Sequence, residues 1–322
     1  MRHPIRLTLL AAGLAAAAGA HAQNYPARPV RMIVPAAPGG GADIVARIVA
    51  IKLTELLGQQ VVVDNRAGAA GTIGAEMTAR AVADGYTVLM AQSTSVAIAP
   101  NLYPKLGYDT LRDFAPISLS AAVPNLVVVH PSIPVTTIKE LIAFAKAKPG
   151  QLNYGSSGTG APSHLAGELL KSLAGAQLTH IPYKGAGPAT ASLLGAETQV
   201  MFAPIVAVIP HVKSNRLRAV AVTTAKRSPA VPEIPTVAES GVPGYEIASW
   251  FGVLGPAKLP PEIVARLNRD LVRAVQAPET KERLANEGAE AIGSTPAQFT
   301  AYLREELARY GKLIRDAGIR AD

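Results

Sequence analysis

Short apolar runs alternate with helical patterns along most of this chain. The apolar runs lie at residues 30–34, 61–63, 87–90, 126–129, 152–154, 178–181, 200–202 and 217–222. Segments with the apolar spacing of a helix lie between them, at 43–57, 71–83, 137–147, 162–174 and 187–195. Such alternation is typical of βαβ units, whose parallel strands are covered on both faces. The sequence therefore predicts an α/β fold with mainly parallel sheets.

The alternation occurs twice, before and after a segment bounded by Pro116 and Pro124. The length of 322 residues exceeds what one ordinary core organises, which favours two lobes. Strands that cross between two such lobes would leave a cleft at the carboxyl ends of both sheets. We expect lobe 1 to contain 23–123 plus 226–322 and lobe 2 to contain 124–225.

The C-terminal part shows a different pattern. Prolines at 260–261, 278 and 296 each stand where a helix is expected to begin, since proline is favoured in the first helical turn. The pattern does not assign the last helix to either lobe.

The first 22 residues have the pattern of a signal peptide. Arg2 and Arg6 precede an Ala/Leu-rich stretch at 7–19, and Ala20-His21-Ala22 matches a small-x-small cleavage site. The apolar stretch is shorter than the roughly 20 residues that span a bilayer. We expect export to the periplasm with cleavage after Ala22.

Composition excludes several classes of site. The chain contains no cysteine, so disulfides, thiolate catalysis and thiolate metal sites are ruled out. The formal charge is +8, but the basic residues are scattered and aromatic residues make up only 5%. Nucleic-acid binding is therefore not expected.

The strongest local signal lies at residues 34–43. An apolar strand ends in a Pro/Gly turn, and a helical pattern begins at Asp43. Gly39, Gly40 and Gly41 leave backbone N–H groups accessible, and the helix behind them adds the positive end of its dipole. Such a corner favours a bound anion. It contains neither a nucleophile nor a metal cage, so it indicates a site that holds a ligand.

Three further corners have the same strand-to-loop-to-helix character. They lie at 65–74, with Gly71 and Thr72; at 92–95, with Ser93 and Ser95; and at 155–164, which carries several glycines and hydroxyls before Pro162. A single corner of this kind is usually an ordinary loop. Four at matching positions in an α/β fold predict the lining of one pocket.

The loops fail the tests for common enzyme motifs. Residues 158–163 approach GxGxxG, but no acidic residue follows about 20 positions later, and 155–160 lack the Lys-Ser/Thr of a P-loop. The histidines have neither HxH nor HExxH spacing, so no metal or cofactor is expected. One catalytic alternative stays open, a secreted serine hydrolase that uses Ser156 or Ser157 with His164.

An ordered series of short motifs extends over nearly the whole chain after residue 22. They are YPARPVRMIVP at 25–35, APGG at 37–40, VDNRAGAAGTIG at 63–74, DGYT at 84–87, DFAP at 113–116, YGSSG at 154–158, HLAGE at 164–168, HIPYKG at 180–185 and PTVAESG at 235–241. With this series the chain resembles the Bug/TctC family of periplasmic solute receptors for tripartite tricarboxylate transporters.

The resemblance implies a two-lobed periplasmic-binding-protein architecture of type II, the Venus flytrap, which closes on one small organic carboxylate. It implies a monomeric receptor rather than an enzyme, and integral-membrane permease subunits as its partners. A receptor that feeds a sensor kinase is the alternative within the same resemblance. Members of the family hold a carboxylate with backbone amides and hydroxyls rather than with an arginine.

The resemblance also implies the ligand-binding residues. They are Ala36, Ala37, Gly39, Gly40, Gly41 and Asp43 in the first corner, Gly71 and Thr72 in the second, Ser93 and Ser95 in the third, Ser156, Ser157, Gly158, Thr159 and His164 in the fourth, and Ala203.

Two of these positions depart from the family pattern. The family often has phenylalanine where Ala36 stands, so we expect a wider pocket wall here. Many members have an aspartate where Ala203 follows Phe202, and that aspartate helps to recognise an amino group. Its absence favours a plain, dicarboxylic or aromatic carboxylate over an amino acid.

Overall fold

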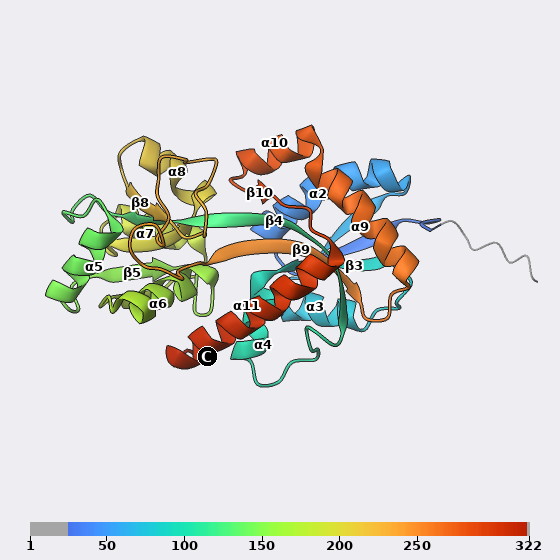
Figure 1. The fold of residues 1–322 in the computed structure, drawn as a ribbon, viewed down its shortest axis with the longest axis horizontal. Helices are drawn as coiled ribbons and strands as arrows, with labels where there is room; N and C mark the ends of the chain where they lie inside the picture. Colours follow the sequence, from blue (N-terminus) through green and yellow to red (C-terminus); the bar gives the residue numbers. More distant parts are fainter. Residues whose placement is uncertain (1–24, 321–322) are drawn as a thin grey trace, which may run out of the picture.

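The computed structural model describes residues 25–320, so the expected signal peptide and its cleavage after Ala22 lie outside the described residues. Within them, no helix has the length and apolar character needed to cross a bilayer. Two α/β halves lie side by side, and two long strands run from one to the other (Figure 1). The predicted α/β class is confirmed.

The first half contains a sheet flanked by helices. Its elements are β1 (Val30–Val34), α2 (Gly41–Leu57), β2 (Val61–Asn65), η1 (Ala69–Gly71), α3 (Thr72–Ala79), β3 (Thr87–Gln92), η2 (Thr94–Ile98) and α4 (Ala99–Leu102). β1 lies between β2 and β3 and runs parallel to both. The carboxyl ends of β1 and β3 therefore meet at one edge, where the first and third corners begin.

The second half has its own group of parallel strands. Its elements are α5 (Ile138–Ala147), β5 (Asn153–Ser156), α6 (Pro162–Ala174), β6 (Thr179–Pro182), α7 (Ala186–Leu194), β7 (Val200–Pro204), α8 (Ile205–Lys213) and β8 (Arg218–Val222). β5 runs parallel to both β6 and β7.

Two crossing strands, β4 (Phe114–Val129) and β9 (Ala248–Pro256), join the halves and make both sheets mixed. β9 lies between β3 and β4 and is antiparallel to both, while β4 continues into the second half and pairs antiparallel with β7 and β8. The parallel pairing predicted from the alternation thus holds for the strands linked by helices. The crossing strands add antiparallel pairs that the alternation did not indicate.

The chain ends with α9 (Pro261–Gln276), α10 (Pro278–Asn286), the short strand β10 (Glu290–Ala291) on β4, and α11 (Pro296–Asp316). Each of these helices begins at a proline, as predicted. α11 also has a capping box, in which Thr295 and Gln298 each bond the other's backbone N–H. Local sequence therefore defines where these helices start.

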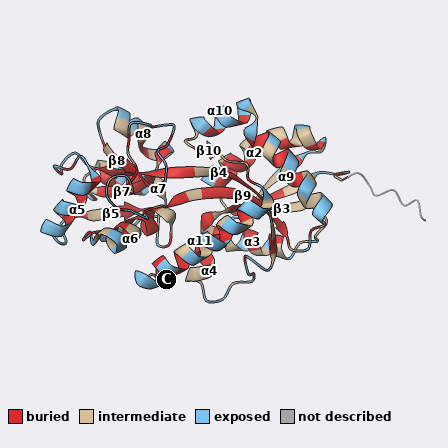
Figure 2. Ribbon diagram, viewed as in Figure 1, coloured by how far each residue is buried: buried red, intermediate tan, exposed pale blue. Residues whose placement is uncertain are grey.

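The buried residues lie mainly along the central strands. Figure 2 shows buried residues along β4 and β9 through the middle of the molecule, with exposed residues on the outer helix faces. Leu126, Val127, Val128 and Val129 of β4 are completely buried, so this strand is covered on both faces. A strand buried in this way reads as a continuous apolar run rather than an alternating one.

The halves meet where β4 and β9 pair at Val123↔Ser249 and Pro124↔Ala248. α11 lies across this junction and contacts β4, η2 and α4 as well as α6 of the second half. The indole N–H of Trp250 on β9 donates to the buried Glu306 of α11 at 2.8 Å. The last helix is therefore attached to both halves at their junction.

Asn125 lies just past this junction and is almost fully buried, at 1% exposure. Its side-chain nitrogen and oxygen have no hydrogen-bond partner among residues 25–320. Since an unpaired buried polar group costs about 1–3 kcal/mol, we expect Asn125→Leu to raise the free energy of unfolding by about 1–2 kcal/mol. Urea denaturation measures this, with Asn125→Asp as a control that should destabilise. A less stable leucine variant would contradict the prediction.

Candidate functional site

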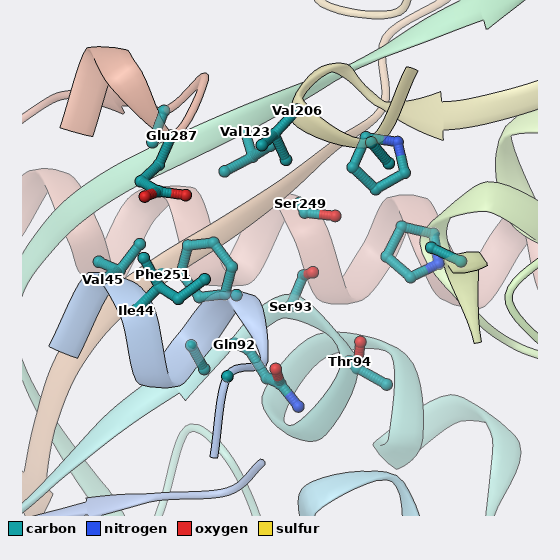
Figure 3. Close-up of a pocket in the computed structure, with 18 residues that line it drawn as sticks. Ile44, Val45, Gln92, Ser93, Thr94, Val123, Val206, Ser249, Phe251 and Glu287 are labelled. Carbon is teal, nitrogen blue, oxygen red and sulfur yellow. The ribbon is translucent and has the colours of Figure 1, made fainter. Parts of the chain in front are cut away.

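A cavity of about 320 Å³ lies between the two halves (Figure 3). From the first half it is lined by the start of α2 and by the residues that follow β3. The crossing strands contribute Val123, Ser249 and Phe251, and the second half contributes Pro162, Ala186, Pro204, Val206 and Ala207. The cavity is thus built from both halves and from the strands that join them, at the carboxyl ends where α/β folds bind ligands.

The third corner supplies the polar end of the cavity. β3 ends at Gln92, and the chain then enters the π-helical turn η2, which brings Ser93 and Thr94 to the cavity beside Ser249 of β9. Within residues 25–320, these three hydroxyls make no hydrogen bond to the protein, whereas Gln92 donates to Pro35 O at 3.4 Å. Three hydroxyls are therefore available to a ligand.

The Asp43 side chain stabilises the turn of the first corner through hydrogen bonds. The Asp43 carboxylate accepts hydrogen bonds from the Gly39 N–H at 2.8 Å, from Arg47 Nε at 2.9 Å and from Asn65 Nδ2 at 3.0 Å. Asp43 is only 3% exposed, and Gly39 has a left-handed φ of +79°. Burial raises the pKa of Asp43, but the bonds from Arg47 and Gly39 outweigh it and hold the pKa below its usual value. Asp43 is a positioning residue for the turn.

Gly41 and Phe251 are in close contact at the cavity wall. A Cβ added at Gly41 would lie 3.1 Å from Cζ of Phe251. A larger residue at position 41 would therefore crowd the aromatic ring of β9, which would have to shift by a few tenths of an ångström. Gly39 and Gly41 both line the cavity, whereas Ala36, Ala37 and Gly40 are not among its lining residues.

The second corner supports the first rather than reaching the cavity. A Cβ on Gly71 would lie 2.9 Å from the Pro35 carbonyl oxygen, and Gly71 has a φ of +86°. The hydroxyl of Thr72 donates to Ala69 O at 2.9 Å. Neither Gly71 nor Thr72 lines the cavity. In the third corner, Ser95 is fully buried and donates to Gln92 O at 3.1 Å, so it too stabilises a turn.

The polar groups of the fourth corner form hydrogen bonds within the second half. Ser156 Oγ lies 2.6 Å from His180 Nε2, the Ser157 N–H donates to Ser163 Oγ at 3.0 Å, and the Gly160 N–H donates to His164 Nδ1 at 3.0 Å. Pro162 reaches the cavity from this corner; the predicted ligand residues Ser156, Ser157, Gly158, Thr159 and His164 do not line it.

His164 and His180 form a stacked pair behind this corner, with ring centroids 3.8 Å apart. Burial, followed by the charge of His164, lowers the pKa of His180 to about 3. Burial also lowers the pKa of His164. Both rings are therefore neutral near pH 7. Ser156 bonds His180 rather than His164 and is completely buried, so its hydroxyl is not exposed to the cavity.

Several lining residues were not predicted from the sequence. Ala203 is fully buried in β7, but the following Pro204, Val206 and Ala207 line the cavity. Ser249, Phe251 and Glu287 were also missed. The apolar run around Trp250 could have indicated β9 as a strand, whereas no local pattern marks Glu287.

Two α/β halves joined by two crossing strands, with a ligand-sized cavity between them, define a two-lobed solute-binding protein. A sequence model of the tripartite tricarboxylate transporter family receptor, TctC, matches residues 45–319. The chain belongs to this family. It is a family of periplasmic substrate-binding receptors without enzymatic activity, so the serine hydrolase alternative is wrong.

Three relatives illustrate the similarity. Protein BugT of Bordetella pertussis is 39% identical over 315 residues, which are 98% of this chain and 96% of BugT. The structure of R. palustris Rpa4515 with adipate has 39% identity and a TM-score of 0.80, covering 92% of this chain and 99% of that one. MatC from Rhodopseudomonas palustris with bound malate has 30% identity and a TM-score of 0.76, covering 90% and 100%.

Proposed function

We propose that this protein captures a small organic carboxylate in the cavity between its halves and delivers it to the integral-membrane subunits of a tripartite tricarboxylate-type transporter. The observation that carries the proposal is the cavity itself, which combines the N-terminus of α2, the glycine turn before it and three unpaired hydroxyls. Rpa4515 with adipate and MatC with malate are relatives solved with carboxylates, which supports the ligand class.

The recognition relies on neutral donors. None of the described lining residues is lysine or arginine, so the carboxylate would be held by the backbone N–H groups of Gly41 and Ala42 at the start of α2 and by Ser93, Thr94 and Ser249. Each hydrogen bond to a charged group contributes about 1.5–3 kcal/mol. Several such bonds bind a carboxylate well, but less tightly than a guanidinium would. This moderate affinity suits a receptor that must release its ligand.

In this proposal, lobe 1 consists of residues 23–123 and 226–322, and lobe 2 consists of residues 124–225. The change of pairing partner on β4, from β9 up to Pro124 to β7 from Asn125, supports a boundary at this point. Rotation about the paired positions Val123 and Ser249 would bring the corner at 155–160 onto the ligand. Ser157, Gly158 and Thr159, which are at least partly exposed, would then lie against the ligand. The ligand would favour this closed form because it binds the closed form more tightly.

Trp250 is the only tryptophan and gives a direct readout of binding. It follows Ser249 and precedes Phe251, which both line the cavity, and its own ring packs on Phe299 and Tyr302 of α11. We expect adipate or malate to change its fluorescence saturably and to raise Tm, since ligand at 100 times Kd stabilises by about 2.7 kcal/mol. Adipamide, which is uncharged, is the control. No response to any acid in a carboxylate panel would sink the receptor function.

Delivery to a permease is tested by uptake. Cells that lack the gene for this protein should lose accumulation of the radiolabelled ligand and regain it when the gene is restored. If the ligand changes gene expression but its uptake does not depend on the protein, the receptor serves a sensor rather than a transporter.

A further inference from the structure

Glu287 is the one charged side chain among the described residues that line the cavity. Its carboxylate has no hydrogen-bond or ion-pair partner within residues 25–320, although the exposed Arg283 lies one turn earlier on α10. Lys52 of α2 bridges Glu55 and Glu279, and Arg47 binds Asp43. A ligand in this cavity therefore meets one formally charged side chain in the described lining, and that charge is negative.

Glu287 stands opposite the polar end of the cavity. Figure 3 shows its carboxylate directed over the apolar wall of Ile44, Val45 and Phe251, whereas Gln92, Ser93 and Thr94 lie across the cavity. The cavity is thus asymmetric. One end offers hydrogen-bond donors to an anion, and the other combines an apolar wall with a carboxylate.

The position of Glu287 is fixed by close packing. It is the C-cap residue that follows α10, and the next residue, Gly288, has a φ of +67°. A Cβ on Gly288 would lie 2.4 Å from Cγ2 of Ile205 on α8. The corner that carries Glu287 therefore packs against the second half. This places the carboxylate where both halves meet around the cavity.

We propose that Glu287 makes this receptor selective for a ligand with one carboxylate, an apolar body and a cationic nitrogen at its far end. This inference rests on the proposed function. A second carboxylate at the far end would be repelled by Glu287, whereas an ammonium group would be attracted and would also face the ring of Phe251. The absence of an aspartate at Ala203 disfavoured an amino group from sequence, but Glu287 supplies an acid from another element.

Three matched six-carbon probes test this selectivity by isothermal titration calorimetry on the chain without residues 1–22. The probes are 6-aminohexanoate, hexanoate and adipate at pH 7. We expect wild type to bind 6-aminohexanoate at least about tenfold more tightly than adipate, with hexanoate between them. Glu287→Gln should weaken 6-aminohexanoate about tenfold and strengthen adipate. Glu282→Gln, an exposed acid on the same helix outside the cavity, should leave the ranking unchanged.

The outcomes separate this inference from the receptor function. If wild type binds adipate at least as tightly as 6-aminohexanoate, or if Glu287→Gln leaves their ratio unchanged, the selectivity role is overturned and the receptor function stands. If wild type does not bind 6-aminohexanoate at all, the inference is also overturned. The receptor function is lost as well only when the whole carboxylate panel fails to perturb Trp250 and Tm.

Discussion

Replacing Gly41 with valine is expected to weaken ligand binding at least about 100-fold while leaving the fold intact. The added Cβ would lie 3.1 Å from Cζ of Phe251, so the ring must move or the side chain must occupy the cavity. Either change removes space next to the backbone N–H groups that would hold the carboxylate. Gly41 is exposed and its φ is not left-handed, so valine introduces no backbone strain.

Calorimetry with the tightest carboxylate of the panel measures this loss, and circular dichroism confirms that the variant is folded. Gly187→Val is the matched control. It makes the same substitution in the first turn of α7, where an added Cβ has no neighbour within 4 Å. It should bind like wild type. Normal affinity in Gly41→Val would remove the first corner from the binding site.

Acidification from pH 7 to pH 4.5 is expected to lower the free energy of unfolding by about 2–3 kcal/mol through the stacked histidines. The pKa of His180 is lowered to about 3 by burial and by His164, while an unfolded histidine titrates near 6.5. Between these values the unfolded chain binds more protons than the folded one. Stability is therefore fully present above about pH 6.5 and falls as the pH drops toward 3.

Urea denaturation at a series of pH values measures how the free energy of unfolding depends on pH. Variants then show which histidine causes that dependence. His180→Gln keeps a hydrogen-bonding group beside Ser156 but cannot titrate, so its stability should change much less between pH 7 and 4.5. His211→Gln, on α8 and outside the pair, should retain the wild-type slope. Glu306 acts in the opposite direction, because burial raises its pKa despite Arg309. A His180→Gln slope equal to wild type would refute the assignment.

The sequence predicted the helix-linked strands and the glycine corners because their signals are local. A strand, a Pro/Gly turn and a helix start follow one another within residues 30–45, and the structure has β1 and α2 in that place. The roles within a corner are harder to predict. Asp43 was expected to bind ligand, but its carboxylate holds the Gly39 turn from behind. Residue types that suit a ligand also suit a tight turn.

The crossing strand β9 and the acid at 287 could not be predicted in this way. β9 pairs Leu254 with Leu89, a contact between segments far apart in sequence, and no crossover helix marks it. Glu287 reaches the cavity only because α10 packs on α2 and its end packs on Ile205. Such placement depends on tertiary packing, so the residues next to Glu287 in the sequence do not indicate that it reaches the cavity.

The place of β9 between β3 and β4 has a consequence for biogenesis. Everything up to residue 247 can be synthesised while this sheet still lacks its central member. Until then, β3 and β4 each present an open edge that can recruit a strand from another polypeptide. Newly made chains should therefore depend on holdase chaperones until residue 256 has emerged, and nascent chains that stop earlier should aggregate.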